Sequence, residues 1–169
     1  RQFWMQMADD DAVRYVSQFS LQSLDELKSI IDEHNGAPER RIVQRLLATE
    51  ITTMVHGADA ARDAEAAADI LFGADPTQAT FEALAAVASE VPTTVTGRDQ
   101  LDDVFGLLAS AGVVASTSDA RRTIAQKGIK VNGAVLEEGQ TLAAHGILHD
   151  KWVLVRKGKT TYHLFDVAR

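Results

Sequence analysis

The sequence predicts an α+β protein: a small all-helical bundle over residues 1–73, a connector over residues 74–100, and an α+β module over residues 101–169. Three observations predict it. Apolar residues recur at helical spacing in the first part, and short strand-like runs separated by turn residues fill the last part, where we expect two helices and a small antiparallel sheet. The charge also changes sign near residue 100: residues 1–100 hold 8 Lys+Arg against 17 Asp+Glu, whereas residues 101–169 hold 9 against 7. This asymmetry predicts two domains with different roles.

Composition narrows the class of protein. With 169 residues, of which 46% are hydrophobic, the chain is long enough for one ordinary domain or two small ones. The absence of cysteine excludes disulfides and thiolate metal sites and favours a cytoplasmic location. No apolar run approaches the roughly 20 residues that span a bilayer, so we expect no membrane partner. The chain begins with Arg1 rather than methionine, which suggests an origin inside a larger protein.

Four helices are expected in the bundle, over residues 13–19, 24–34, 38–56 and 59–72. Ser23 is a good N-cap for the second helix, and Glu26 completes a capping box. Pro38 is placed to open the third. In the connector, residues 80–88 predict a short helix and residues 91–97 an extended segment.

The last third begins with two predicted helices. Leu101 starts an amphipathic pattern that ends at Gly112. Ser116 caps the second helix, which ends at Gly128, and Asp119 is placed to return a hydrogen bond to the backbone amide of the cap.

Two hairpins follow, with strands expected at residues 129–131, 134–136, 152–155 and 162–165. Asn132-Gly133 is the preferred dipeptide of a tight two-residue turn. The second turn, Arg156–Lys159, is basic. We therefore expect a small antiparallel sheet after the two helices.

The second of these helices carries a candidate binding surface. At about 100° per residue, Arg122 points into solvent, with Arg121 at the edge of the same side. Guanidinium groups match phosphate geometry, and Lys127, Lys130 and the Asn132 amide can extend the patch along an RNA backbone. Ordinary surface charges would give the same pattern, and chemistry alone leaves both interpretations open.

The string from Ser116 to Ile124, followed by Gly128–Gly133, resembles the small RNA-binding fold named after ribosomal small-subunit protein four. In that fold a serine-rich cap precedes an acidic residue, alanine and two arginines, and a valine–asparagine–glycine hairpin follows. The resemblance covers residues 101–169. The candidate RNA-binding residues are Arg121, Arg122, Lys127, Lys130 and Asn132, which the resemblance places on the RNA-facing surface, together with Ser118, Arg156, Lys157 and Lys159.

The helical part is similar to the region that follows the catalytic domain in bacterial tyrosyl-tRNA synthetases. The residues that carry this resemblance are Phe3–Gln6, Asp9–Asp11, Val13–Tyr15, the stretch from Phe19 to Leu27, and Gln44–Thr52 leading into Val55–Gly57. It implies an anticodon-binding-type domain followed by a tRNA-binding module. Together these would hold the anticodon stem-loop and the variable arm of tyrosine tRNA. Possible additional tRNA contacts are Arg14, Arg40, Arg41 and Arg45.

The two ATP-handling signatures of that family, the His-Ile-Gly-His-type element and the Lys-Met-Ser-Lys-Ser-type loop, do not occur in this sequence. We therefore expect no catalytic residue and no cofactor in this chain, although the resemblance implies a parent enzyme that uses ATP and tyrosine. The family works as a dimer joined through its catalytic domains, so this chain is expected to be a monomer.

The histidines suggest no second site. His56, at a helix end before glycine, is expected to cap terminal carbonyls rather than to act as a base. His145 and His149 have the spacing of metal ligands on a helix, but Gly146 lies between them and no third ligand is evident, so we expect no metal site.

Two further patterns have structural interpretations. Gly158–Thr160 is similar to the end of a phosphate-binding loop, but Val153 stands where that loop needs glycine, and the segment fits a hairpin better. Trp152 and Phe165 are expected in the core, whereas for Tyr162 core packing and base stacking both stay open.

The alternative function is a freestanding RNA-binding protein, either a ribosome-associated stress factor or the appendage of an RNA-modifying enzyme. An upstream reading frame that encodes a nucleotide-binding domain with both signatures would favour the synthetase, and a start codon at Arg1 would favour the alternative.

Overall fold

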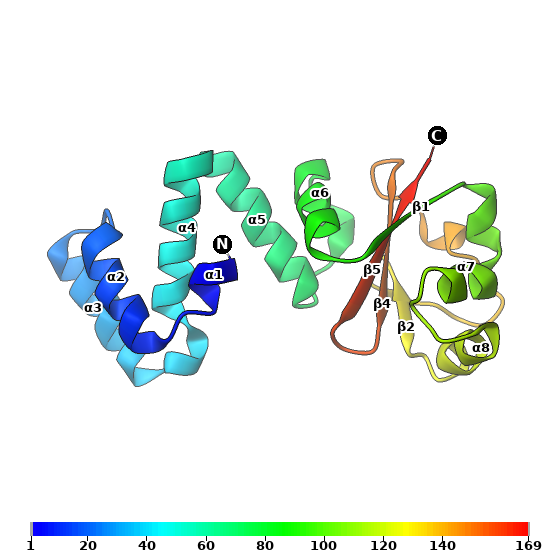
Figure 1. Cartoon of the computed structure of the whole chain (residues 1–169), viewed down its shortest axis with the longest axis horizontal. Helices are drawn as coiled ribbons and strands as arrows, with labels where there is room; N and C mark the ends of the chain where they lie inside the picture. The colour runs from blue at the N-terminus through cyan, green and yellow to red at the C-terminus, as the bar shows by residue number, and fades with distance from the viewer. Residues whose placement is uncertain (1, 169) are drawn as a thin grey trace. The chain divides into compact units, whose positions relative to one another are not determined.

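A computed structural model describes residues 2–168 of the chain (Figure 1). The chain forms two compact units, of which the first extends to Glu65 and the second begins at Ala66.

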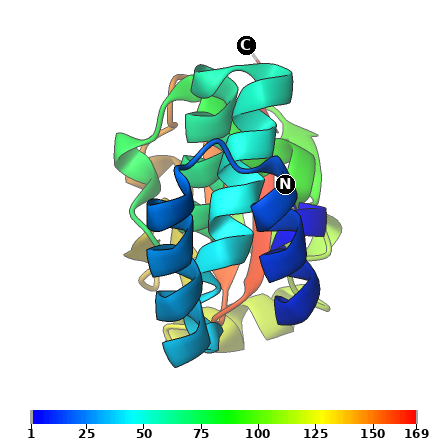
Figure 2. The same cartoon turned by 90° about the vertical axis from the view of Figure 1, so that its left-hand side faces the viewer.

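The first unit is helical, as the sequence predicts. Its helices are α1 (Gln2–Met5), α2 (Asp9–Phe19), α3 (Leu24–Gly36), the 3-10 turn η1 (Pro38–Arg40), α4 (Ile42–His56) and the beginning of α5 (Ala58–Leu71). Helix α4 contacts α1, α2 and α3, and Figure 2 shows it, in cyan, among the blue helices. The core that these helices share consists of Ala12, Val16, Leu27, Val43 and Leu47.

The starts of α3 and α4 can be compared with the predicted capping box at Ser23 and the predicted helix start at Pro38. Ser23 and Glu26 form the predicted capping box, in which each side chain accepts a hydrogen bond from the backbone of the other. Pro38, however, opens η1 rather than α4. Arg41 then adopts a left-handed φ of 52°, which separates the two elements, and α4 begins at Ile42.

The second unit combines helices with a sheet and confirms the α+β class. It contains the end of α5, η2 (Pro76–Gln78), α6 (Phe81–Glu90), β1 (Thr93–Thr96), η3 (Asp99–Asp102), α7 (Val104–Ser110), α8 (Thr117–Ala125), β2 (Ile129–Val131), β3 (Ala134–Val135), η4 (Ala143–His145), β4 (Trp152–Lys157) and β5 (Thr161–Val167). The amphipathic helix expected from Leu101 begins later, at Val104, because residues Asp99–Asp102 form η3 and the Asp103 side chain caps α7 by accepting a hydrogen bond from the Gly106 amide.

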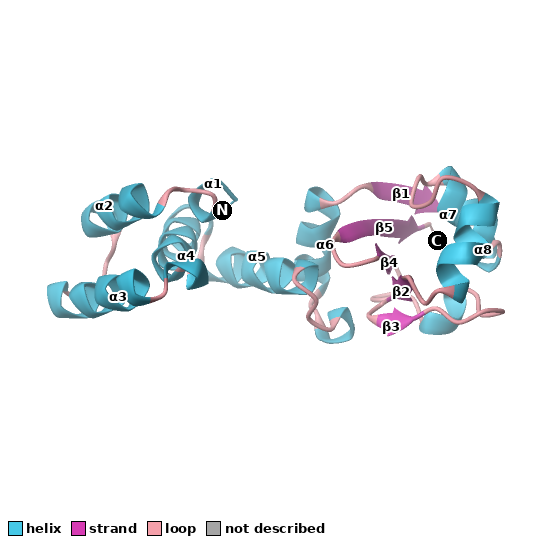
Figure 3. Cartoon of the chain, turned by 90° about the horizontal axis from the view of Figure 1, so that it is seen from below, coloured by secondary structure: helices cyan, strands magenta, loops and turns pink. Residues whose placement is uncertain are grey.

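The sheet has five strands in the order β1-β5-β4-β2-β3, which can be followed in Figure 3. Strands β2 to β5 pair antiparallel, as predicted, and β1 adds an edge strand parallel to β5. The predicted connector, residues 74–100, thus contributes α6 and β1 to the second unit. The domain boundaries at residues 73 and 100 stay predictions.

Both faces of this sheet are covered, with α6 on one side and α7 and α8 on the other (Figure 1). The core on the α7–α8 side includes Ile129, Val131, Val153, Val155, Phe165 and Val167 from the sheet. The core on the other side joins Trp152, Leu154, Tyr162 and Leu164 to Ala67 and Ile70 of α5 and Leu84 and Val87 of α6. Because successive side chains of a strand point to opposite faces, every polar strand residue is assigned to one of these two sides.

Candidate nucleic-acid interface

Two hydrogen bonds fix the start of α8. The Ser116 hydroxyl accepts a hydrogen bond from the Asp119 amide at 3.1 Å, which confirms the predicted N-cap. The Asp119 carboxylate accepts a hydrogen bond from the Ala115 amide, also at 3.1 Å. The expectation that this carboxylate accepts a hydrogen bond from the Ser116 amide was wrong, because its partner is the amide of the residue before the cap, Ala115.

The end of α8 sets the position of Lys127. The Lys127 amide donates to the Ile124 carbonyl and the Gly128 amide to the Thr123 carbonyl, both at 2.8 Å, which is the Schellman pattern. Lys127, rather than a glycine, occupies the left-handed position of this pattern, with φ of 55°. A Cβ on Gly128 would lie 2.9 Å from Thr123 Cγ2, so the close approach of this turn requires glycine. The helix therefore ends at Ala125, before the expected Gly128.

Two cations meet at Asp119. Arg122 Nη2 lies 2.6 Å from Asp119 Oδ1, and Lys157 Nζ, which comes from β4, lies 3.6 Å from Oδ2. The Ala115 amide, followed by the Arg122 guanidinium, holds the pKa of the Asp119 carboxyl below its usual value. Asp119 is therefore ionised at neutral pH and orients both cations, while the Arg122 side chain remains 70% exposed, as predicted.

The other candidates lie on α8, directly after it, or in the β4–β5 turn. Arg121 is exposed, with its guanidinium 5.0 Å from the centre of the Phe105 ring. Ser118 lies exposed on the first turn of α8, and Lys159 lies exposed in the β4–β5 turn. Lys127 Nζ is 3.5 Å from a carboxylate oxygen of Glu137. We call the set Ser118, Arg121, Arg122, Lys127, Lys157 and Lys159 the α8 surface.

Lys130 and Arg156 are not part of the α8 surface. They lie opposite each other across β2 and β4. Their strand neighbours Ile129, Val131 and Val155 point into the core beneath α7 and α8, so Lys130 and Arg156 point to the other face of the sheet.

Asn132 is buried, with only 4% of its surface exposed. Its side-chain amide donates to the carbonyls of His145 and Gly146, at 3.2 and 2.9 Å, and its Oδ1 accepts from the Leu154 amide at 2.8 Å. These bonds join the β2–β3 turn to β4 and to η4. Because both polar atoms of its side chain are engaged within the protein, Asn132 has a structural role and is not part of the α8 surface.

The arginines of the first unit divide in a similar way. Arg14 and Arg45 are exposed. Arg40 pairs with Glu33 at 2.8 Å and stays largely exposed. Arg41 donates from Nη2 to the Met7 carbonyl at 2.8 Å and is partly buried, so it links α4 to the α1–α2 turn.

His145, His149 and three aromatic residues of the second unit are hydrogen-bonded within the protein or packed in its core. His145 Nε2 lies 3.2 Å from Gln140 Oε1, and His149 Nε2 lies 2.8 Å from the Ala79 carbonyl oxygen. Trp152 and Phe165 are buried, which confirms the prediction. Tyr162 is also in the core, with its hydroxyl donating to the Ile70 carbonyl at 3.1 Å.

Within residues 2–168, no group of three or more His, Asp or Glu side chains is arranged to hold a metal ion. The same part of the chain has no helix that is both long and apolar enough to cross a membrane.

Comparison with known proteins gives the family. Residues 83–165 match the family described as the tyrosine–tRNA ligase SYY-like C-terminal domain. Over nearly its whole length the chain is also similar to curated tyrosine–tRNA ligases: it is 40% identical over 171 residues to that of Anaeromyxobacter dehalogenans strain 2CP-C. The chain belongs to the tyrosine–tRNA ligase family, as a C-terminal region of that kind of protein.

Two further tyrosine–tRNA ligases give the same result. That of Mycobacterium sp. strain KMS is 37% identical over 94% of this chain, and that of Geobacillus stearothermophilus is 34% identical over 99%. The matched segments make up 38% of the Mycobacterium ligase and 40% of the Geobacillus ligase. The Anaeromyxobacter match covers 98% of this chain and 40% of that ligase. The chain thus spans about two fifths of the tyrosine–tRNA ligases it matches.

One residue of the candidate interface has a second role that the interpretation of the sequence as a helix cap does not include. The sequence predicts Asp119 as part of the helix cap, and in the structure Asp119 also pairs with Arg122 and Lys157. Its spacing of three residues from Arg122 could have predicted that ion pair. The contribution of Lys157, 38 positions along the chain, depends on the pairing of β2 with β4 and has no local signal.

Proposed function

We propose that this chain is the tRNA-binding part of a tyrosine–tRNA ligase, and that its α8 surface binds the RNA backbone. The observation that carries the proposal is the convergence of Arg122 and Lys157 on Asp119. A carboxylate between two cations leaves a net positive charge and holds both donors in place. Preorganised cations lose less side-chain entropy when a phosphate binds than mobile ones do.

The distribution of charge supports this assignment. The second unit carries the basic residues of the α8 surface, whereas the total charge of the chain is −7. Local basic surface, rather than net charge, determines the electrostatic attraction of a nucleic acid. In the first unit, Arg14 and Arg45 are the arginines best placed to add contacts, because Arg40 and Arg41 already have protein partners.

The ligand is proposed to be tyrosine tRNA, held through its anticodon stem-loop and variable arm. The parent enzyme would couple tyrosine to ATP and transfer it to the tRNA in the cytoplasm, whereas this chain would bind neither ATP nor tyrosine. We further propose that this chain is a monomer and that the parent enzyme dimerises through its catalytic domain.

A competition experiment tests the proposal. The 169-residue chain is bound to labelled tyrosine tRNA at one fixed salt concentration, and unlabelled tyrosine tRNA or an unrelated tRNA with a short variable arm is added. We expect tyrosine tRNA to compete at clearly lower concentration. Equal competition by both tRNAs would reduce the assignment to general RNA binding, and the absence of a complex at low salt would overturn it.

A further inference from the structure

Lys130 and Arg156 are an unusual pair for a β-sheet. They are directly opposed in the antiparallel ladder of β2 and β4, and both are half-buried. Opposed side chains in such a ladder have Cβ atoms about 4.5–5.5 Å apart, and like charges at this position destabilise the sheet. The pair therefore has an electrostatic cost that the fold must offset or that a ligand must relieve.

No carboxylate in the described part of the chain forms an ion pair with either side chain. Lys127, Lys151 and Lys157 each have a carboxylate within 4.0 Å, but neither Lys130 nor Arg156 has one among residues 2–168. Asp75 lies near the same place, beside Gly133. Its Oδ1 accepts hydrogen bonds from the Thr77 amide and hydroxyl at 2.9 and 2.7 Å, and Asp75 forms no ion pair with Lys130 or Arg156.

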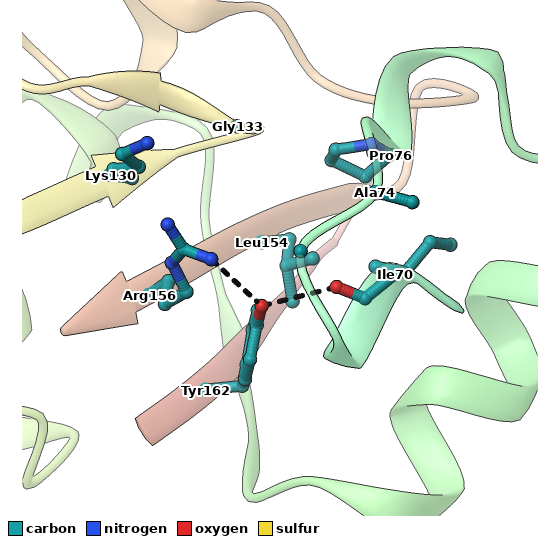
Figure 4. Close-up of a pocket in the computed structure, with 9 residues that line it drawn as sticks. Ile70, Ala74, Pro76, Lys130, Gly133, Leu154, Arg156 and Tyr162 are labelled. Atoms are coloured by element: carbon teal, nitrogen blue, oxygen red, sulfur yellow. Dashed lines mark hydrogen bonds between the residues drawn. The ribbon is translucent and has the colours of Figure 1, made fainter. Parts of the chain in front are cut away.

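The Arg156 guanidinium is held in position from one side only. Its Nη1 donates to the Tyr162 hydroxyl at 3.3 Å, and that hydroxyl in turn donates to the Ile70 carbonyl at 3.1 Å (Figure 4). The guanidinium also lies 5.8 Å from the centre of the Tyr162 ring. This support orients the group while leaving its other donors available for a ligand.

A pocket opens beside the two cations. Lys130 and Arg156 line it together with Gly73, Ala74, Pro76 and Gly133. Gly73 has φ of 110°, and a Cβ there would lie 3.3 Å from Arg156 Nη1. Glycine at this position therefore keeps the space next to the guanidinium open. In Figure 4 the labelled Lys130 and Arg156 side chains come from neighbouring strands, with Ala74 and Pro76 across from them.

We propose that Lys130 and Arg156 form a phosphate-binding site on the sheet face opposite α8, and that its occupant is a phosphodiester group of the bound RNA. An ammonium group and a guanidinium fork together provide several donors and two positive charges, which suit the oxygens of a phosphate. The inference rests on the proposed RNA binding. It adds a contact that the α8 surface cannot make, because the two sites lie on different sides of the sheet.

The test uses the 169-residue chain and the substitution Lys130→Gln, with Lys28→Gln as the control. Lys28 is exposed on α3, so the control removes the same charge far along the chain from the pocket. Binding of tyrosine tRNA is measured over a series of salt concentrations. We expect Lys130→Gln to weaken binding about fivefold to tenfold at low salt and to reduce the log–log salt slope by roughly 0.7–0.9, the contribution of one phosphate contact. The control should change neither quantity.

A second variant and a chemical probe keep the test specific. Arg156→Lys retains the charge but removes the fork, so its loss of affinity should be smaller than that of Arg156→Gln. Ethylation of individual tRNA phosphates should block binding of the original chain at one or two positions that no longer matter for Lys130→Gln. Thermal unfolding of each variant verifies that it folds.

The outcomes separate this proposal from the proposed function. If Arg121→Ala/Arg122→Ala weakens tRNA binding but Lys130→Gln behaves like Lys28→Gln, the second site is overturned and the proposed function stands. If none of these variants weakens binding, the assignment of the α8 surface to RNA also falls. If Lys130→Gln abolishes a shift caused by inorganic phosphate in NMR spectra but leaves tRNA binding intact, the pocket takes free phosphate, and its assignment to RNA is overturned.

Discussion

The guanidinium of Arg122 lies 2.6 Å from the carboxylate of Asp119, one helical turn earlier on α8. The same carboxylate accepts a hydrogen bond from the Ala115 amide and pairs with Lys157 of β4. One acidic side chain therefore connects the helix cap, the helix surface and the sheet. In a chain whose proposed ligand is an anion, its role is to orient two cations rather than to bind the ligand itself.

The titration of Asp119 tests this arrangement. Its pKa is lowered chiefly by the Ala115 amide and next by Arg122, so its carboxyl should titrate below the value of about 3.9 for an unperturbed aspartate. A lowered pKa means that the stabilisation is present above the unfolded-state pKa and is lost as the pH falls through the folded-state pKa. Carboxyl-detected NMR should show this low midpoint, and Arg122→Ala should raise it only in part. A midpoint at or above 3.9 in the original chain would contradict the arrangement.

Asn132→Ala should reduce stability rather than remove an RNA contact directly. The substitution leaves the buried Leu154 amide without its side-chain partner and removes both bonds to the η4 region. An unsatisfied buried group costs about 1–3 kcal/mol, so we expect a loss of about 2 kcal/mol in the free energy of unfolding. Urea denaturation measures it, with Lys159→Ala in the exposed β4–β5 turn as a control expected to change stability by less than about 0.5 kcal/mol. Equal stability of the two variants would show that the Asn132 bonds contribute nothing.

His163 predicts a pH dependence of the second unit. Its side chain is buried beside Phe165, its Nε2 lies 2.9 Å from Thr94 Oγ1, and burial lowers its pKa. The unfolded chain therefore binds a proton more readily than the folded chain does, and stability should fall as the pH drops below about 6.5. We expect His163→Gln to reduce the loss of Tm between pH 7.5 and pH 5.5. An identical loss in both proteins would remove His163 as a cause.

The features predicted correctly from the sequence are local. The Ser23 and Ser116 caps and the Asn132-Gly133 turn depend on residues within a few positions of one another. Such short-range interactions can be predicted from the sequence. The core positions of Trp152 and Phe165 were predicted from the aromatic and β-branched composition of their strands, which is also a local property of the sequence.

The features that the sequence did not predict depend on distant contacts. The parallel pairing of β1 with β5 joins segments about 70 residues apart, and it brings α6 and β1 into the second unit. The burial of Asn132 depends on η4 and β4, and the division of the basic residues between two faces depends on strand register. A shift of the strand register by one residue would exchange the two faces. Spacing along the chain therefore could not assign the basic residues to one face or the other.

The salt dependence of tyrosine tRNA binding by Arg121→Ala/Arg122→Ala tests the central claim most directly. Both side chains are exposed, so the double substitution should cost less than about 0.5 kcal/mol of stability. Lys28→Ala/Arg62→Ala, which removes two exposed charges from the first unit, is the matched control. We predict weaker binding and a log–log slope reduced by roughly one to two for the α8 variant, on the scale of about 0.7–0.9 per phosphate contact, and no such change for the control. An affinity and slope equal to those of the control would contradict the assignment of the α8 surface to RNA.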